Sequence, residues 1–210
     1  MKDIQKRKAA YLTSEERRAA IVEAAYKVIQ EHGYAKLTAR RIAEHPGVSL
    51  GHITYNFRDM NEILVEAYRY SSRSLVAIAA GELDSAPDDP YEKLEHFIRA
   101  FFKPAVLNDK TLRVRIDLWS AALNSDEIRQ TEVALYDHYR EFLGGLLTSL
   151  ATNRGQPADR VQFLVDSITA FSDGVWLEWL RRRDKQALEN AIQGCLLLVN
   201  TVLPVSAARP

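Results

Sequence analysis

Residues 38–57 gather side chains that can hydrogen-bond to phosphate groups and to the edges of bases. The segment reads TARRIAEHPGVSLGHITYNF, and its apolar residues Val48, Ile53 and Phe57 recur on one side of a helix. The positions around them are mostly polar or small, so hydroxyl, imidazole and amide groups are predicted to point away from the core. A short helix with such a surface can enter the major groove of DNA.

Two helices and a tight turn must position these side chains. Thr38 is predicted to cap the first helix and Ser49 the second, because their hydroxyl oxygens can accept from free N–H groups of a first turn. Between them, Pro46 disfavours helical backbone at the preceding residue, and Gly47 can adopt the positive φ of a sharp turn. The segment is therefore predicted to be a helix-turn-helix.

The same segment contains a G-x-S-x-G motif at Gly47, Ser49 and Gly51, which is typical of the nucleophile elbow of serine hydrolases. That elbow needs a buried strand leading into the serine. Here a predicted helix ending in Glu-His-Pro precedes the serine, and no strand-like apolar run is present. We therefore favour DNA binding over hydrolysis.

The flanking sequence predicts one helix before this motif and another after it. Apolar residues repeat with a helical period between Ser14 and Gly33, so we expect a helix that Ser14 caps and Gly33 ends. With Ser14 as the cap, Arg17 occupies the capping-box position that Glu usually fills. Asp59 and Glu62 have capping-box spacing and predict the start of a longer helix.

Together these segments resemble the DNA-binding domain of the TetR family of bacterial repressors. The resemblance rests on A-A-x-x-V-I-x-E-x-G-Y at 24–34, T-x-R-x-I-A at 38–43, G-V-S-x-G at 47–51 and I-x-Y-x-F-x-D at 53–59. It implies an all-α fold of about nine helices, a homodimer, a palindromic double-stranded DNA operator and a small-molecule effector. It also implies a ligand-responsive regulator, most often a repressor released from its operator by the ligand.

The family resemblance assigns DNA contacts to particular positions of this chain. They are Thr38, Arg40, Arg41, Ser49, Gly51, His52, Tyr55 and Asn56. The chain departs from many family members at Met60, where they carry Lys, and at Thr54, where they carry Tyr. The absence of that Lys removes one possible phosphate contact.

The charge distribution separates the chain into two parts. The whole chain carries 28 Lys and Arg against 28 Asp and Glu, but residues 1–58 carry 11 against 6, a net charge of +5. A basic segment on an acidic remainder is typical of a DNA-binding domain joined to another domain. We therefore expect a DNA-binding domain at 1–58 and a ligand-binding and dimerisation domain at 59–210.

Several other functional classes lack support in the sequence. The five histidines show no metal-ligand spacing, and neither a P-loop nor a dinucleotide fingerprint occurs, so no catalytic residue, metal or cofactor is predicted and the chain is not expected to be an enzyme. The single cysteine, Cys195, is predicted to be a buried thiol. With no long apolar run and no secretory signal, we expect no membrane segment and a cytoplasmic location.

Helical periodicity continues through the second part of the chain. Helices are predicted at 59–83, 91–103, 109–123, 125–153, 158–182 and 184–203. The last two carry broad apolar faces that need cover on more than one side, which favours dimerisation. Residues 171–177, FSDGVWL, also resemble the D-G-L-W-L segment of the choline-responsive BetI branch of the family.

The effector is the least determined part of the prediction. Tryptophan faces beside carboxylates favour a cationic amine. The tryptophans in question are Trp119, Trp176 and Trp179, with Asp117, Asp173 and Glu178 close in sequence, and the chosen candidates for the site are Asp117, Trp119, Asp173 and Trp176. A neutral hydrophobic effector, held by Phe101, Phe102, Trp119 and Phe171, is an alternative, and so is a purely structural role for the tryptophans. A further alternative for the whole chain is action through a protein partner without operator binding.

Overall fold

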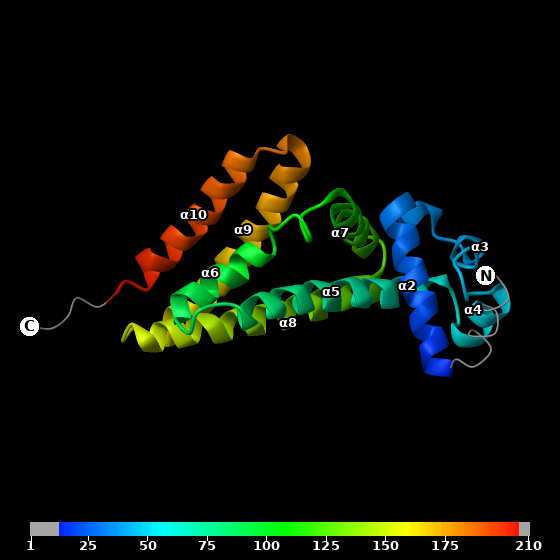
Figure 1. Cartoon of the computed structure of the whole chain (residues 1–210), viewed down its shortest axis with the longest axis horizontal. Coiled ribbons are helices and arrows are strands. Elements are labelled where there is room, and N and C mark those ends of the chain that lie inside the picture. Colours follow the sequence, from blue (N-terminus) through cyan, green and yellow to red (C-terminus); the bar gives the residue numbers. More distant parts are fainter. Residues whose placement is uncertain (1–12, 206–210) are drawn as a thin grey trace, which may run out of the picture. The chain divides into compact units, whose positions relative to one another are not determined.

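The computed structural model describes residues 13–205, which form nine α-helices, two short 3-10 turns and no strand (Figure 1). The predicted all-α class and helix number are confirmed. The helices are α2 (Ser14–His32), α3 (Ala39–Ile42), α4 (Leu50–Asn56), α5 (Met60–Asp84), α6 (Pro90–Ala100), α7 (Asp109–Ala122), α8 (Asp126–Asn153), α9 (Val161–Arg182) and α10 (Lys185–Val202). The turns are η1 (Tyr34–Lys36) and η2 (Ala158–Arg160). Over the same residues, no helix is both long enough and apolar enough to cross a bilayer.

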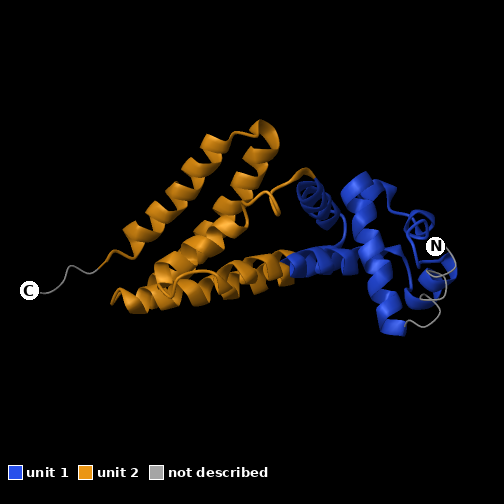
Figure 2. Cartoon of the chain, viewed as in Figure 1, with its two compact units in different colours: residues 1–74, 110–133 blue, residues 75–109, 134–210 orange. Residues whose placement is uncertain are grey.

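The described residues fall into two compact units, shown in different colours in Figure 2. Unit 1 contains residues 13–74 and 110–133, and unit 2 contains 75–109 and 134–205. Two helices, α5 and α8, begin in unit 1 and continue without interruption into unit 2. The predicted boundary between functional domains after residue 58 stays a prediction.

The core of unit 1 joins the N-terminal helices to parts of the chain that are distant in sequence. Apolar side chains of α2, α3, α4 and the first half of α5 form one buried cluster with side chains of α7 and α8. From α7 and α8 this cluster includes Val114, Leu118, Ala121 and Ile128. The helix-turn-helix is therefore packed in the same core as α7.

The predicted cap of the first helix was wrong by one residue. Thr13 precedes α2, its hydroxyl accepts from the backbone N–H of Glu16 at 3.2 Å, and its own N–H donates to the Glu16 carboxylate at 2.7 Å. This pairing selects Thr13 because Glu16, three residues later, completes the capping box, whereas Ser14 would place Arg17 there. At the other end, Gly33 terminates α2 with φ +81°, as predicted.

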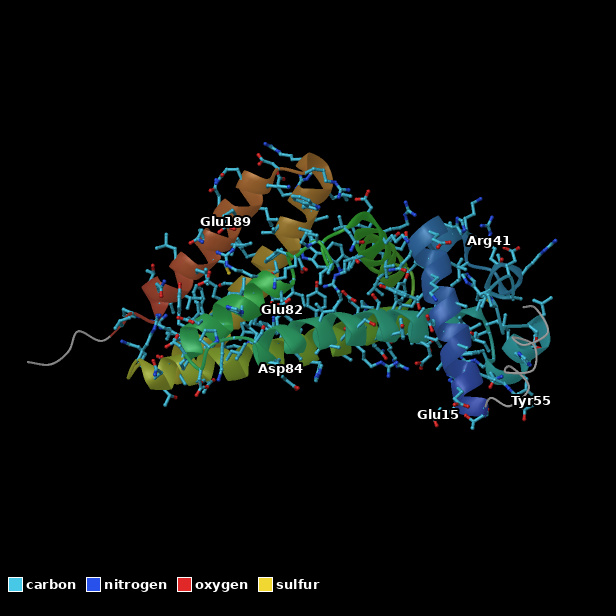
Figure 3. All side chains as sticks on the ribbon, viewed as in Figure 1. Glu15, Arg41, Tyr55, Glu82, Asp84 and Glu189 are labelled. Carbon is cyan, nitrogen blue, oxygen red and sulfur yellow. The ribbon has the colours of Figure 1, made fainter. Side chains whose placement is uncertain are left out.

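In unit 2, apolar side chains are buried on α6, on the C-terminal part of α8, on α9 and on α10, among them Leu94, Leu147, Ile168 and Leu196. Arg99 on α6 forms a bidentate ion pair with Glu189 on α10, with both N···O distances 2.9 Å (Glu189 is labelled in Figure 3). This guanidinium lowers the pKa of the Glu189 carboxyl to about 2. Cys195 is buried, as predicted, and burial raises the pKa of its thiol to about 11. The thiolate needed for reactivity is therefore disfavoured.

Candidate functional site

The helix-turn-helix is built by the local signals that predicted it. The Thr38 hydroxyl accepts from the backbone N–H of Arg41 at 3.3 Å, and the Ser49 hydroxyl accepts from that of His52 at 3.2 Å. Gly47 has φ +82° in the turn between the two helices. Because Ser49 caps a helix and follows another helix and a turn, it does not form a nucleophile elbow.

One side of α4 projects into solvent. Tyr55, labelled in Figure 3, is 83% exposed, and Leu50 in the first turn is 53% exposed. Thr54 is also exposed, but its hydroxyl donates back to the carbonyls of Leu50 and Gly51 at 3.2 and 3.3 Å. Tyr55 is thus the α4 side chain best placed to contact another molecule.

Two of the predicted DNA contacts, His52 and Asn56, are half-buried. Asn56 is half-buried: its amide donates to the His52 carbonyl at 2.8 Å and accepts from the Ser14 hydroxyl at 3.3 Å. Its backbone carbonyl accepts from Arg18 at 2.7 Å. His52 is also half-buried, and its Nδ1 atom is buried without a hydrogen-bond partner. The contacts of Asn56 with Ser14 and Arg18 hold α4 on α2, in addition to any role of Asn56 toward DNA.

The remaining predicted contacts surround the same two helices. Arg40 is exposed and Arg41 is half-buried, both on α3 (Arg41 is labelled in Figure 3). Gly51 is exposed, and a Cβ atom added there would lie 4.0 Å from the Ser49 hydroxyl oxygen, in ordinary contact. Packing inside the chain therefore does not require glycine at this position. The helix starts at Thr38 and Ser49 supply backbone N–H groups, which attract phosphate.

The predicted effector residues of unit 2 lie in different environments. Phe101 belongs to an aromatic cluster, with its ring centre 5.2 Å from that of Phe97 and 5.1 Å from that of Tyr139. Phe102 and Trp176 are buried in unit 2. Asp173 accepts a hydrogen bond from the Tyr136 hydroxyl.

Phe171 lies beside a cavity of about 300 Å³ between α9 and α10. It is 42% exposed, and the Trp179 ring lines the same cavity with its Nε1 atom buried and unpartnered. The two carboxylates in the lining are engaged: Glu178 pairs with Arg182 at 2.6 Å, and Asp184 caps α10. Of the residues that the sequence suggested for the effector, Phe171, Glu178 and Trp179 line this cavity.

Asp117 and Trp119 belong to unit 1 and have partners there. Asp117 accepts from the backbone N–H of Tyr34 at 2.6 Å. One turn earlier, Arg113 donates to the carbonyls of Gln30 and Glu31 at 2.9 and 2.7 Å, at the end of α2. Helix α7 thus holds both the last carbonyls of α2 and the first N–H group beyond Gly33.

Trp119 is bonded in the opposite direction, toward α8. Its indole N–H donates to the Glu132 carboxylate at 3.0 Å, and the Arg115 guanidinium lies 5.3 Å from its ring centre. Nothing in the local sequence distinguishes Glu132 from the other acidic residues of α8. Glu132 is distinguished only by its hydrogen bond to Trp119, which forms when the chain folds.

Comparison with known proteins gives the family. A sequence profile described as "BetI-type transcriptional repressor, C-terminal" matches residues 90–204, and one described as "Bacterial regulatory proteins, tetR family" matches residues 21–67. The chain belongs to the TetR family. Its C-terminal part is of the BetI type, which confirms both resemblances drawn from the sequence.

Relatives of this TetR-family regulator match most of its length. An HTH-type transcriptional regulator BetI from Stenotrophomonas maltophilia is 27% identical over 161 residues, covering 77% of this chain and 80% of the relative. A BetI from Burkholderia thailandensis is 24% identical over the same shares of both chains.

Solved structures agree with the fold. A transcriptional regulator from Pseudomonas aeruginosa PAO1 has a TM-score of 0.79 and 26% identity, covering 94% of this chain and 95% of its own. A regulator from Saccharomonospora viridis, solved in complex with choline, has a TM-score of 0.72 and 23% identity, covering 89% and 96%.

The protein is therefore a TetR-family transcriptional regulator, and ligand-responsive repression is typical of that family. The comparisons give no support to the alternative of a chain that acts through a protein partner without operator binding.

Proposed function

We propose that this regulator binds a palindromic operator as a homodimer, with α4 of each copy in the major groove, and that a small organic cation releases it. The observation that carries DNA binding is the α4 surface, where Tyr55 is almost fully exposed on a helix that two hydroxyl caps and a positive-φ glycine hold in place. Phosphate contacts come from Thr38, Ser49 and Tyr55, while His52 and Asn56 contribute to sequence preference.

A gel-shift series on DNA upstream of the chain's own gene tests operator binding. Tyr55→Phe removes one hydroxyl and should weaken binding by about fivefold on every sequence, since one hydrogen bond contributes about 1 kcal/mol. His52→Gln should instead change which operator is preferred. Thr38→Ser is the control, because it keeps the hydroxyl that accepts from Arg41.

The salt dependence of the same assay measures the phosphate contacts. A tenfold rise in salt concentration should lower the decimal logarithm of the affinity by about 0.9 for each phosphate that the protein neutralises. Affinity that is insensitive both to salt and to Tyr55→Phe would show that α4 is not the DNA-binding element.

The dimer interface is assigned to the exposed apolar side of α9 and α10 in unit 2. Phe163, Phe171 and Leu177 on α9 and Leu197 on α10 are large apolar residues that the single chain leaves exposed. Reading a palindrome requires two copies related by a two-fold axis, and such an interface uses the same surface twice. Leu197→Lys should convert the dimer to monomers in sedimentation, while Ser149→Lys, at an exposed position of α8 outside this surface, should not.

The effector class rests on tryptophan and carboxylate chemistry together with the comparisons. The Trp119 ring already has a cation over it, that of Arg115, and its indole N–H contacts a carboxylate. Cation–π contacts contribute about 0.5–2 kcal/mol. The choline complex of the Saccharomonospora viridis regulator and the BetI relatives support the same class.

Thermal-shift measurements with choline and putrescine, compared with an uncharged apolar alcohol and an anionic fatty acid, separate the cationic effector from the neutral one. We expect stabilisation by the cations, and the same compounds should weaken operator binding. Operator DNA must then weaken effector binding by the same factor, because coupling between two sites is reciprocal. Stabilisation by uncharged or anionic compounds alone would overturn the cationic class while leaving operator binding intact.

A further inference from the structure

A tyrosine hydroxyl is buried in unit 1 without a hydrogen-bond partner. Tyr68, on α5, is 1% exposed, and its hydroxyl oxygen has no partner within the described residues. Leaving such a group unpaired costs free energy, because it has lost its hydrogen bonds to water. The Tyr68 hydroxyl therefore either destabilises the fold or hydrogen-bonds to a molecule that is not part of the chain.

The surroundings of this hydroxyl are negatively charged. Burial raises the pKa of Tyr68, and the charges of Asp117 and Glu132 raise it further. Both carboxylates are thus close enough to act on the same buried oxygen atom. Each is held in place by a bond to a group other than Tyr68: Asp117 by the Tyr34 N–H, and Glu132 by the Trp119 indole.

Three helices of unit 1 bring these groups together. Tyr68 comes from α5, Asp117 and Trp119 from α7, and Glu132 from the first turns of α8, all within the same compact unit. An aromatic ring, fixed carboxylates and an unsatisfied hydroxyl are groups that a small organic cation can contact. The chain's own Arg115 guanidinium lies 5.3 Å from the Trp119 ring centre, so the ligand cation must displace it or use the other face of the ring.

We propose that Tyr68, Trp119 and Glu132 bind the effector, and that the effector is a small organic cation carrying a hydroxyl or N–H group. The inference rests on the proposed effector class and deepens it. Trp119 and Glu132 hold the positive charge, and Tyr68 hydrogen-bonds to the polar group of the ligand. Asp173 and Trp176, predicted from the sequence, are not required.

Asp117 gives the site a route to the DNA-binding helices. Its carboxylate holds the Tyr34 N–H at the end of α2, and its charge also reaches the Tyr68 hydroxyl. A cation bound beside Tyr68 attracts this carboxylate and competes with the Tyr34 N–H for it. Asp117 is therefore a positioning residue that links effector binding to α2.

The test compares three related compounds by calorimetry on the full-length dimer. Choline has both a positive charge and a hydroxyl, and tetramethylammonium has the charge without the hydroxyl. The alcohol 3,3-dimethyl-1-butanol has the shape and hydroxyl of choline without its charge. Tyr68→Phe should reduce choline affinity about fivefold, the effect of one hydrogen bond, and leave tetramethylammonium affinity unchanged. Glu132→Gln should reduce the affinity of both cations by about tenfold or more, because it removes a charge-assisted contact.

Matched controls separate binding from folding. Tyr70→Phe makes the same change on the same helix at a ring that packs edge-to-face on Tyr26, and it should leave choline binding unchanged. Tyr68→Phe should keep or raise the melting temperature, since it removes an unpartnered buried hydroxyl. Each variant should still bind operator DNA in the absence of choline.

The outcomes distinguish this site from the proposed function. Equal choline affinity in the wild type and in Tyr68→Phe would overturn the assignment of Tyr68, while the cationic effector class would stand. Loss of choline binding in Asp173→Asn, with Glu132→Gln unaffected, would move the site to unit 2. A wild type that binds operator DNA but none of the cations would overturn both the effector class and this site.

Discussion

Helices α4 and α7 both carry polar side chains that the sequence marks as functional, but they use them in opposite ways. On α4, Tyr55 points outward and has no structural task in the chain. On α7, Asp117 and Trp119 are bonded to groups 83 and 13 residues away. The sequence shows that both helices carry hydrogen-bonding side chains. Only the fold shows which of these side chains bond within the chain and which are left for another molecule.

The largest effect on stability is expected from α7. Asp117→Ala removes the acceptor of the Tyr34 N–H at the end of α2 and should lower the free energy of unfolding by about 1–2 kcal/mol. Chemical denaturation measures this change. Asp137→Ala, at an exposed position of α8, is the control and should change the value by less than about 0.5 kcal/mol. Equal effects of the two variants would show that the Asp117 contact has no structural weight.

An intermediate effect is expected at the start of α4. Ser49→Ala removes the hydroxyl that accepts from the His52 N–H and should cost about 1 kcal/mol. Ser49→Asp keeps a capping oxygen, so its stability should remain close to that of the wild type. It places a negative charge where phosphate is expected to bind, so its operator affinity should fall sharply. A Ser49→Asp variant that binds operator normally would place the phosphate elsewhere.

The smallest effect on stability is expected at the outer face of α4. Tyr55→Phe should change the free energy of unfolding by less than about 0.5 kcal/mol, because the hydroxyl lies in solvent. The same variant is expected to weaken operator binding, so stability and function separate at this residue. A clear loss of stability would mean that Tyr55 has an internal role after all.

The features predicted correctly from the sequence depend on neighbouring residues. The caps at Thr38 and Ser49, the turn at Gly47 and the end of α2 at Gly33 each follow from a few adjacent side chains. The one misplaced cap, at Ser14, also depends on adjacent residues, because Glu16 completes a capping box with Thr13.

The features that could not be predicted depend on distant partners. The bond from Trp119 to Glu132 and the orphan hydroxyl of Tyr68 arise only when α5, α7 and α8 meet. Helical periodicity places each of these residues on a helix but does not fix which helices are neighbours. Two of the predicted effector residues, Asp117 and Trp119, therefore belong to unit 1, and the others belong to unit 2.

The continuity of α5 and α8 through both units has a consequence for heat denaturation. A helix propagates cooperatively, so melting it in one unit frays it in the other. Units joined by a flexible linker would melt independently and give separate heat-absorption peaks. With two uninterrupted helices in common, the chain should instead absorb heat in a single peak whose calorimetric and van't Hoff enthalpies agree for the dimer. A ligand bound in unit 1 should then also protect unit 2 from thermal unfolding.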